Sequence, residues 1–364
     1  MPQVRVRLKE RSYPVVIGSK IADRLPALVE KQLSGGRIFV FLDSHFYGLH
    51  GRKLTRTLKQ VGKSIELVIP GEERMKTASQ LNRIYDFLMS QKISRSDFIL
   101  ACGGGVVSDL VGYAAATTLR GLKWGIVSTT LLGMVDAAIG GKTGINHAGG
   151  KNLIGAIWQP AFVSCDIEHL MTLPKRQLVS GLGEVVKYGG LVGKPMLAEI
   201  EKLVDSGNLY NERLLLKLVH LSARYKAEIV ATDERDGGRR MFLNLGHTFS
   251  HGIEAAVPVG RLGHGEALLI GLVAVCEMSR RKFDAPLGSF TAMVETLLQQ
   301  VKYHAIDAAA VRRAMKLDKK RAGRAAKFIL LRKPGQPIIV DDANGQLVTG
   351  SLSYALKRYK NIGG

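Results

Sequence analysis

Two histidines four positions apart, His247 and His251, follow polar residues that are spaced for one face of a helix. Arg240, Asn244 and the two histidines occur at intervals of four, three and four positions, and the residues between them are largely apolar. The pattern predicts a helix that is packed into the protein and presents one polar face. A third histidine, His264, follows in the segment Leu-Gly-His-Gly-Glu.

A carboxylate and an amine lie one helical turn apart further upstream, at Glu184 and Lys187. Glu184, His247 and His264 would together form the catalytic type of zinc site, which has three protein ligands and an open fourth position. The spacing alone equally permits His247 and His251 as the ligand pair. The residues therefore predict a metal site and leave the choice of histidines open.

Two glycine-containing loops in the first half of the chain could hold phosphate groups. Residues 70–76 and 102–109 each follow a predicted strand and precede a predicted helix. Glycine lets the backbone approach a pyrophosphate at a helix N-terminus, and two such loops after neighbouring strands favour one extended cofactor across the sheet edge. Ser108 stands where the dinucleotide fingerprint has its last glycine, and a tight structural turn is the alternative.

A further glycine-rich segment, residues 129–152, contains Gly-Gly-Lys-Thr. The leading glycine of a P-loop would fall at position 136, which is Asp136, so a P-loop is excluded. Lys142, Lys151 and Asn152 could still bind an anion. A glycine-rich loop with only a structural role is the alternative.

The elements that must position these residues alternate between strand and helix in the first half. A helix is predicted over 78–91. The predicted strands are 38–42, 66–69, 98–101 and 124–127. This alternation predicts a mostly parallel sheet with helices on its faces, and such sheets carry their chemistry beyond the carboxyl ends of the strands.

Helical patterns dominate the second half, with a short strand pair predicted at 328–331 and 337–340. We therefore expect two domains. Residues 1–172 are predicted to form an α/β domain with a mostly parallel sheet, and residues 173–364 a mainly α-helical domain. A length of 364 residues agrees with two domains.

Composition excludes several classes of protein. Three scattered cysteines argue for a reducing cytosol and against a disulfide scaffold. We see no secretory signal, and the longest apolar run, 267–276, is shorter than the roughly 20 residues of a membrane span. A net charge of +21 could attract nucleic acid, anionic membranes or a polyanionic substrate, but sparse aromatic residues weaken a nucleic-acid interpretation.

The order of motifs resembles the 3-dehydroquinate synthase family of sugar-phosphate cyclases. The segments that carry the resemblance run from about Arg11 to Leu331 and include GEERMK, GGGVVSDL, VDAAIGGKTGIN, GLGEVVKYG and LNLGHTFSHGIE. The resemblance implies an NAD-binding N-terminal domain and a helical, metal-binding C-terminal domain. It also implies a cytoplasmic homodimer of the shikimate pathway, which uses NAD and Zn²⁺ or Co²⁺ and has no nucleic-acid or membrane partner.

The reaction implied is the conversion of the anionic sugar phosphate 3-deoxy-D-arabino-heptulosonate 7-phosphate to 3-dehydroquinate and phosphate. Its steps are transient oxidation by NAD, β-elimination of phosphate, re-reduction and an intramolecular aldol closure. The chain would thus be a phosphorus–oxygen lyase. A substrate with a carboxylate and a phosphate explains several cations in the motifs but not the charge of the whole chain.

The resemblance also assigns residues, position by position. Its metal ligands are Glu184, His247 and His264, which makes His251 a substrate-side group. It places these residues against the substrate: Asp136, Lys142, Asn152, Lys187, Lys226, Arg240, Asn244, His251, Lys319 and Arg120. Arg120 would be donated across the dimer. The residues it places against NAD are Asp43, Gly71, Glu72, Glu73, Arg74, Met75, Lys76, Gly103, Gly104, Gly105, Val106, Val107, Ser108, Asp109, Thr129, Thr130, Lys142, Lys151, His169, Leu170, Met171 and Thr172.

The sequence departs from the family pattern at a few positions. Ser108 replaces a glycine, Gly183 stands where alanine is common, and residues 133–134 and 137–138 replace the commoner AQ and SS pairs. The last variant is also compatible with aminodehydroquinate synthases. An NAD- and metal-dependent polyol dehydrogenase and a basic nucleic-acid-binding protein are the more distant alternatives.

Overall fold

The computed structural model describes residues 3–235, 238–321, 327–341 and 344–363, without the side chains of 318–321. The chain folds into two compact units. The first comprises Met1–Leu173 and Val219–Arg235, and the second comprises Pro174–Leu218 and Asp236–Gly364. A mostly parallel sheet in the first unit and helices in the second confirm the predicted fold class.

Within the described residues, the first unit contains a seven-stranded sheet in the order β1-β2-β9-β6-β5-β3-β4. Its strands are β1 (Gln3–Val6), β2 (Tyr13–Gly18), β3 (Ile38–Asp43), β4 (Ser64–Ile69), β5 (Phe98–Gly103), β6 (Trp124–Ser128) and β9 (Val163–Asp166). Only the β1–β2 pair is antiparallel in this sheet. The predicted strands at β3, β4, β5 and β6 are confirmed, whereas β1, β2 and β9 were not predicted.

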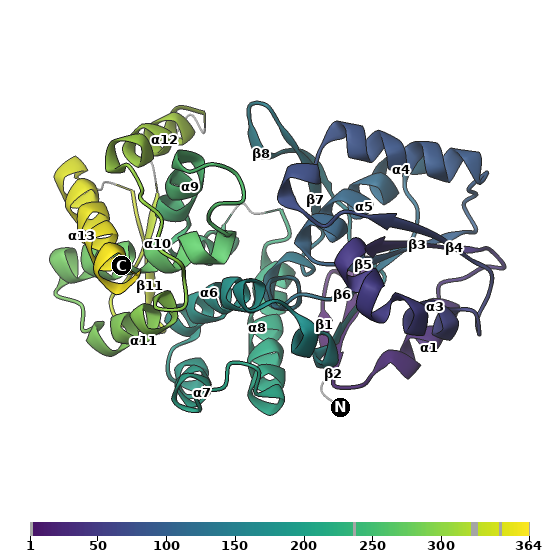
Figure 1. Cartoon of the computed structure of the whole chain (residues 1–364), viewed down its shortest axis with the longest axis horizontal. Helices are drawn as coiled ribbons and strands as arrows, with labels where there is room; N and C mark the ends of the chain where they lie inside the picture. The colour runs from purple at the N-terminus through teal and green to yellow at the C-terminus, as the bar shows by residue number, and fades with distance from the viewer. Residues whose placement is uncertain (1–2, 236–237, 322–326, 342–343, 364) are drawn as a thin grey trace. The chain divides into compact units, whose positions relative to one another are not determined.

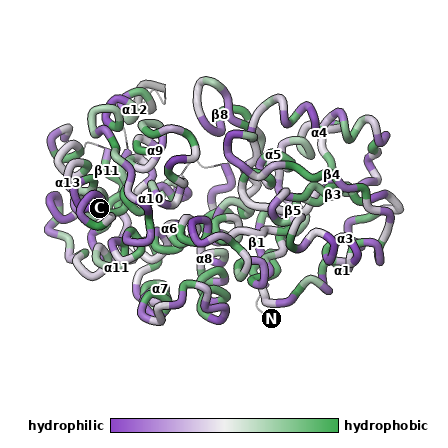
Figure 2. The backbone as a smooth tube through the Cα atoms, in the orientation of Figure 1, coloured by the Kyte–Doolittle hydropathy of each residue, from purple (hydrophilic) through white to green (hydrophobic). Residues whose placement is uncertain are grey.

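Helices cover both faces of this sheet, with α1 and α3 on one face and α4 and α5 on the other (Figure 1). The helices of this unit are α1 (Leu25–Glu30), α2 (Ser44–Phe46), α3 (Arg52–Leu58), α4 (Ala78–Ser90) and α5 (Gly105–Thr117). The side chains of alternate residues of β3 pack on opposite faces of the sheet. Val40 and Leu42 join the α1 and α3 core, whereas Phe39 and Phe41 each meet Phe87 of α4 edge to face. Figure 2 shows the hydrophobic run along β3 and its neighbours.

An antiparallel hairpin, β7 (Lys142–His147) and β8 (Gly150–Ile157), follows the short helical segment Gly133–Ala137. The sequence analysis treated this glycine-rich stretch as a loop, so the hairpin was missed. Its residues do not alternate clearly between polar and apolar, because β8 is exposed along nearly its whole length. One side of β7 packs on α5, with Ile145 buried.

The second unit is helical, as predicted after residue 173. Its elements are α6 (Lys175–Val192), α7 (Lys194–Asp205), α9 (His247–Ala256), α10 (His264–Phe283), α11 (Gly288–Leu298), α12 (Ala308–Arg321), α13 (Gly345–Gly363), β10 (Phe328–Leu331) and β11 (Pro337–Val340). The pair β10–β11 is antiparallel and confirms the predicted strands. Helix α10 is buried along most of its length and packs against α6, α9, α11 and α13. Helix α8 (Glu212–Thr232) has residues in both units.

Among the described helices, none is sufficiently long and apolar to span a membrane.

An ion pair between the partly exposed Arg37 and the buried Asp97 joins the residues that immediately precede β3 and β5, the strands that carry Asp43 and Gly103 at their other ends. The Asp97 carboxylate accepts hydrogen bonds from the Arg37 backbone at 2.7 Å, the Arg37 guanidinium at 2.8 Å and the Ser94 backbone at 2.8 Å. Burial favours the neutral acid, but these hydrogen bonds together hold the pKa of Asp97 below its ordinary value. The carboxylate therefore stabilises the folded chain as an anion.

Replacing Asp97 with asparagine should lower the free energy of unfolding by about 1–3 kcal/mol near neutral pH, because buried donors lose their charged acceptor. Since the folded pKa is depressed, the wild type holds this advantage above the unfolded pKa, about 3.9, and loses it as pH falls through the folded value. Urea unfolding at pH 7 and at pH 3 measures the difference. The exposed Asp86→Asn is the control, and an Asp97→Asn effect that is unchanged at pH 3 would contradict the linkage.

Candidate functional site

Three potential metal ligands come together in the second unit. Glu184 lies on α6, while His247 and His264 are the first residues of α9 and α10. Their ligand atoms all lie within 4.8 Å of one another, and no other such group of three occurs in the part of the chain that the structure describes. Nε2 of His264 and Nε2 of His247 lie 3.1 and 3.4 Å from Glu184 Oε1.

The outer nitrogen of each histidine has its own partner. Nδ1 of His264 lies 3.2 Å from Glu254 Oε2, and Nδ1 of His247 lies 3.2 Å from the Leu245 carbonyl oxygen. Metal-binding histidines commonly have such partners, which orient the ring and fix its tautomer. The sequence analysis missed Glu254, although its position seven residues after His247 on one helix face was a usable signal.

The charge of Glu184 dominates the electrostatics of this cluster. Its side chain is fully buried, and Lys187 Nζ lies 2.5 Å from Oε2. Burial favours the neutral acid, but Lys187 and the two histidines hold the pKa of Glu184 well below its ordinary range. Burial would lower the pKa of His264, yet hydrogen bonds to Glu184 and Glu254 raise it to about 10. One buried carboxylate and two imidazole nitrogens, all within 4.8 Å of one another, form a donor set that fits a zinc-like divalent ion.

Glycines allow the helices that carry two of these ligands to approach closely. A Cβ atom on Gly183 would lie 2.5 Å from the Gly265 carbonyl oxygen, and one on Gly265 would collide with the Ser180 carbonyl oxygen. The Ser180 hydroxyl accepts a hydrogen bond of 3.0 Å from the Gly265 backbone. This backbone packing of α6 on α10 places Glu184 beside His264, and it accounts for glycine at position 183.

The single polar helix face predicted for four residues is wrong. A 3₁₀ helix, Arg239–Asn244, ends before α9 begins at His247, and Gly246 between them has a φ of +82°. Arg240 and Asn244 therefore do not share a helix with the histidines. Arg240 is buried and Asn244 is exposed.

His251 is exposed and lies beside the cluster, with its ring centre 5.4 Å from that of His247 and 6.4 Å from that of His264. It does not belong to the group of three ligands. Lys319 falls in α12, but its side chain lies outside the described part of the chain.

Except for Lys142 and Lys151, which lie on the β7–β8 hairpin, the residues assigned to NAD lie at the carboxyl ends of strands in the first unit. They follow β3, β4, β5, β6 and β9, at Asp43, 71–76, 103–109, 129–130 and 169–172. The two glycine loops do not follow adjacent strands, which corrects the prediction, because β3 lies between β4 and β5. Asp43 at the end of β3 therefore lies between the two loops.

Close contacts join these strand ends. The Asp43 carboxylate accepts hydrogen bonds from the backbone of His45 and Phe46, and its other oxygen lies where a side chain on Gly71 would project. A Cβ atom on Gly104 would lie 2.9 Å from Thr130 Cγ2. Glycine is therefore needed at both loops for space.

Lys76 connects the first glycine loop to α5 and to the hairpin. Its side chain is 3% exposed, and Nζ contacts Asp109 Oδ2 and Asn152 Oδ1. Asn146, which the site prediction omitted, donates to Glu73 Oε1 at 2.8 Å and accepts from the Asn152 backbone at 2.9 Å. The Ser108 hydroxyl donates to the Gly105 carbonyl at 3.0 Å and is thus engaged within α5.

A second feature that the site prediction missed lies next to His169. The rings of Phe46 and His50 lie 4.9 and 5.2 Å from the His169 ring, and His50 Nε2 lies 2.8 Å from the Thr172 hydroxyl. Burial lowers the pKa of His169 to about 4, so it is neutral near pH 7. Phe46 and His50 follow soon after Asp43 at the end of β3, and this was the available sequence signal for the feature.

The remaining predicted residues occupy separate places in the first unit. Lys226 on α8 is 5% exposed, and its Nζ lies 2.7 Å from Asp136 Oδ1. Lys142 and Lys151 are exposed on the hairpin. Arg120 is exposed and has a φ of +63°, a strained backbone conformation for a residue of this kind.

Solved structures place the chain among cyclases of this fold. 2-Deoxy-scyllo-inosose synthase, in complex with carbaglucose-6-phosphate, NAD⁺ and Co²⁺, has a TM-score of 0.86 and 22% identity, covering 96% of this chain and 99% of that one. ValA, the 2-epi-5-epi-valiolone synthase of Streptomyces hygroscopicus subsp. jinggangensis 5008, with NAD⁺ and Zn²⁺ bound, has a TM-score of 0.86 and 27% identity, covering 97% and 99%. Glycerol dehydrogenase of Schizosaccharomyces pombe has a TM-score of 0.63 and 17% identity, covering 96% and 90%, and shares the fold.

Sequence comparison identifies the family within that class. Residues 66–180 match the 3-dehydroquinate synthase N-terminal family and residues 181–321 match the 3-dehydroquinate synthase C-terminal family. The 3-dehydroquinate synthase of Acidithiobacillus ferrooxidans is 39% identical over 357 residues, covering 97% of this chain and 98% of that protein. The one from Pseudomonas fluorescens is 37% identical and covers 97% of both chains. The chain belongs to the 3-dehydroquinate synthase family.

Because His247 belongs to the ligand cluster and His251 does not, variants of the two residues should behave differently. His247→Ala should lose the metal, because only two protein ligands would remain. His251→Ala should keep stoichiometric metal and lose turnover by about 10²–10⁴-fold, the scale of a positioned acid–base group. Metal content and activity of both purified variants test this, with circular dichroism to confirm folding. A metal-free His251→Ala beside a metal-loaded His247→Ala would refute the ligand assignment.

Proposed function

We propose that this protein is a 3-dehydroquinate synthase that converts 3-deoxy-D-arabino-heptulosonate 7-phosphate to 3-dehydroquinate and phosphate. Full-length identity of 37–39% to proteins of that name carries the proposal. The cluster of Glu184, His247 and His264 supports it, since its donor set suits a catalytic divalent metal.

The proposal includes NAD and Zn²⁺ or Co²⁺ as cofactors. Bound NAD⁺ would supply a reversible hydride acceptor, and the divalent metal would polarise substrate oxygens. The strand-end residues of the first unit would hold NAD, with Gly71 and Gly104 allowing Asp43 and Thr130 to lie close against the two loops. We assign NAD binding to residues 1–172 and metal binding to residues 173–364.

Cations would bind the carboxylate and the phosphate of the substrate. Arg240 is buried, and a buried guanidinium suits bidentate binding of such an anion. Lys187 and Lys226 are also almost fully buried. In this assignment Lys187 would orient a substrate oxygen while offsetting the charge of Glu184, and Lys226 would act together with Asp136.

Other residues would position the leaving group and move protons. We assign His251 and Asn244 to holding the phosphate, because both are exposed and His251 lies beside the ligand cluster. The substrate phosphate would then accept the proton whose removal starts the elimination. Asn152, Lys142 and Lys319 complete the proposed substrate contacts.

A cytoplasmic homodimer is part of the same proposal. Arg120, which the family donates across its dimer, is exposed and is held with a positive φ. Strained backbone persists where the surroundings fix it, often at functional positions. The exposed Arg120 side chain is accessible to a second chain, as the proposed dimer requires.

One further candidate rests on a specific observation. Residues Ala137 and Ala138 stand where the family commonly has two serines, a variant that is also compatible with aminodehydroquinate synthases. That activity remains the alternative within the cyclases. A polyol dehydrogenase has only the shared fold in its favour.

The redox cycle gives the sharpest test of the function. The heptulosonate phosphate is added with substoichiometric NAD⁺ and zinc, and phosphate, dehydroquinate and NADH are measured. Phosphate and dehydroquinate should form in equal amounts far above the NADH concentration, because the hydride returns within each turnover. NADH that accumulates in step with product would indicate a dehydrogenase, and turnover of only an amino-substituted substrate would indicate the aminodehydroquinate alternative.

Metal removal gives a second test. Chelation should abolish activity, and Zn²⁺ or Co²⁺ should restore it, because Glu184 and the two histidines would be left without their cation. His264→Ala should lose metal binding, while the exposed Lys202→Gln, far along the chain from the ligands, serves as a control. Full activity of a preparation shown to be metal-free would refute the role of the metal.

A further inference from the structure

A cavity of about 320 Å³ lies in the second unit, lined by the segment before α12 and by α13. None of its lining residues belongs to the metal cluster or to the residues assigned to NAD or substrate. Pockets for small molecules begin at about this volume, so the cavity has room for a compact ligand.

The lining combines ring faces with aliphatic side chains. The rings of Tyr303 and Tyr359 lie 5.3 Å apart at 48° and are joined in the lining by Ile306 and Leu356. The Tyr359 hydroxyl donates to the Lys302 carbonyl at 2.7 Å and accepts from the His304 backbone at 3.0 Å. Tyr359 is 1% exposed and its hydroxyl is engaged, so it forms an apolar inner wall, while the partly exposed Tyr303 supplies a ring that suits an apolar or aromatic body.

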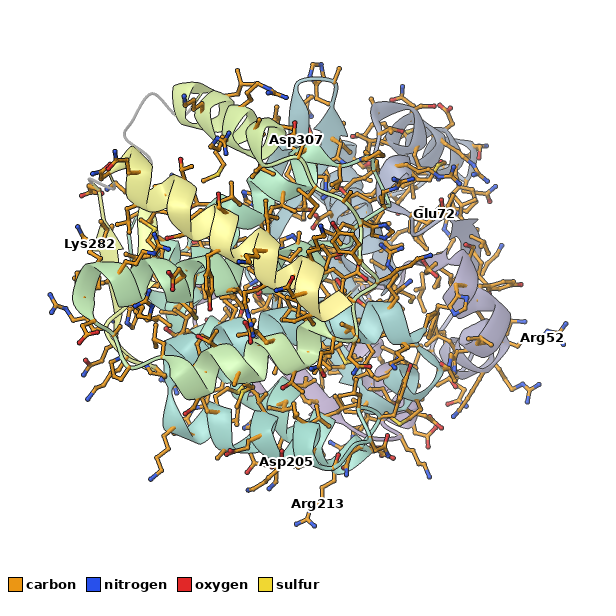
Figure 3. All side chains as sticks on the ribbon, turned by 60° about the vertical axis from the view of Figure 1, so that its left-hand side comes forward. Arg52, Glu72, Asp205, Arg213, Lys282 and Asp307 are labelled. Carbon is orange, nitrogen blue, oxygen red and sulfur yellow. The ribbon has the colours of Figure 1, made fainter. Side chains whose placement is uncertain are left out.

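The charged groups of the lining are all basic. Lys357 and Lys360 lie one turn apart on α13, and neither makes an ion pair among the described residues. No lining residue is an acid. Asp307, labelled in Figure 3, is the nearest acid in sequence, but it accepts from the Ala309 backbone at 2.8 Å and lies 3.6 Å from Arg313.

His304 also lines the cavity, and the charged groups near it are mainly positive. Its pKa is lowered first by burial and then by the cations Arg261, Lys302 and Arg176. Burial disfavours charge of either sign, but the three cations contribute a positive potential at His304 that would attract an anion.

We propose that this cavity binds a small carboxylate with an apolar or aromatic body and no ammonium group. The two tyrosine rings and the aliphatic side chains would contact the body, and Lys357 and Lys360 would contact the carboxylate. An ammonium group is excluded because the lining offers no acid to pair with it. The cavity would thus be a second ligand site, separate from the residues proposed for catalysis.

Binding of 3-phenylpropionate to the full-length protein tests the proposal directly, by titration calorimetry at low ionic strength. Lys357→Gln combined with Lys360→Gln should weaken binding about 2–30-fold, the usual range for two exposed charges together. Lys282→Gln combined with Lys333→Gln removes the same charge outside the cavity and should change the affinity less than twofold. An equal loss of affinity in both double variants would show that only the net charge of the protein matters, and it would contradict the proposed site.

Two further measurements keep the proposal falsifiable. Ser353→Trp places a large side chain into the lining and should abolish binding, with a thermal melt to confirm that the variant folds. Benzylamine and phenylalanine, which carry an ammonium group, should bind at least tenfold more weakly than 3-phenylpropionate. Absence of 3-phenylpropionate binding at millimolar concentration, or equal binding of benzylamine, would overturn the proposal. Neither readout depends on catalytic activity.

Discussion

The negative charge of Glu184 is the constraint around which the second unit is organised. A fully buried carboxylate is costly unless positive groups or a metal compensate it. Lys187 comes from the next turn of α6, and His247 and His264 come from the first residues of two other helices. The first residues of α9 and α10 thus both contact Glu184 Oε1. The same attraction prepares the cluster for a divalent cation.

The alternating β and α pattern was enough to predict the fold class, because the short continuous apolar runs of β3, β5 and β6 differ clearly from the helical pattern of α4. Strands β1, β2 and β9 and the hairpin β7–β8 were not found in this way. β8 is exposed on nearly its whole length, so burial leaves no alternation in its sequence. The order of strands, which puts β3 between the two glycine loops, is a tertiary property that spacing does not contain.

Spacing was also an incomplete guide to the site. The interval of four between His247 and His251 permits a shared metal. The family resemblance favours His264 instead, and α6 and α10 bring His264 together with Glu184 and His247. The helix predicted across Arg240 and His247 failed at Gly246, where a left-handed residue separates two helical segments. Glu254 and Asn146 became recognisable once their partners were known, because their roles depend on contacts with other segments.

Gly183 and Gly265 show how neighbouring positions can constrain one another's evolution. Alanine at position 183 is common in the family, yet here its methyl group would meet the Gly265 carbonyl at 2.5 Å. A contact of 2.5 Å with a backbone oxygen is too short for a methyl group, so substitution at 183 requires the backbone of α6 or of the start of α10 to shift, and a shift of α10 carries His264 with it. Residue 183 is in this sense epistatic to the metal ligands: grafting a relative's α6 into this chain transfers its sequence but not its ligand spacing, unless the start of α10 is exchanged with it.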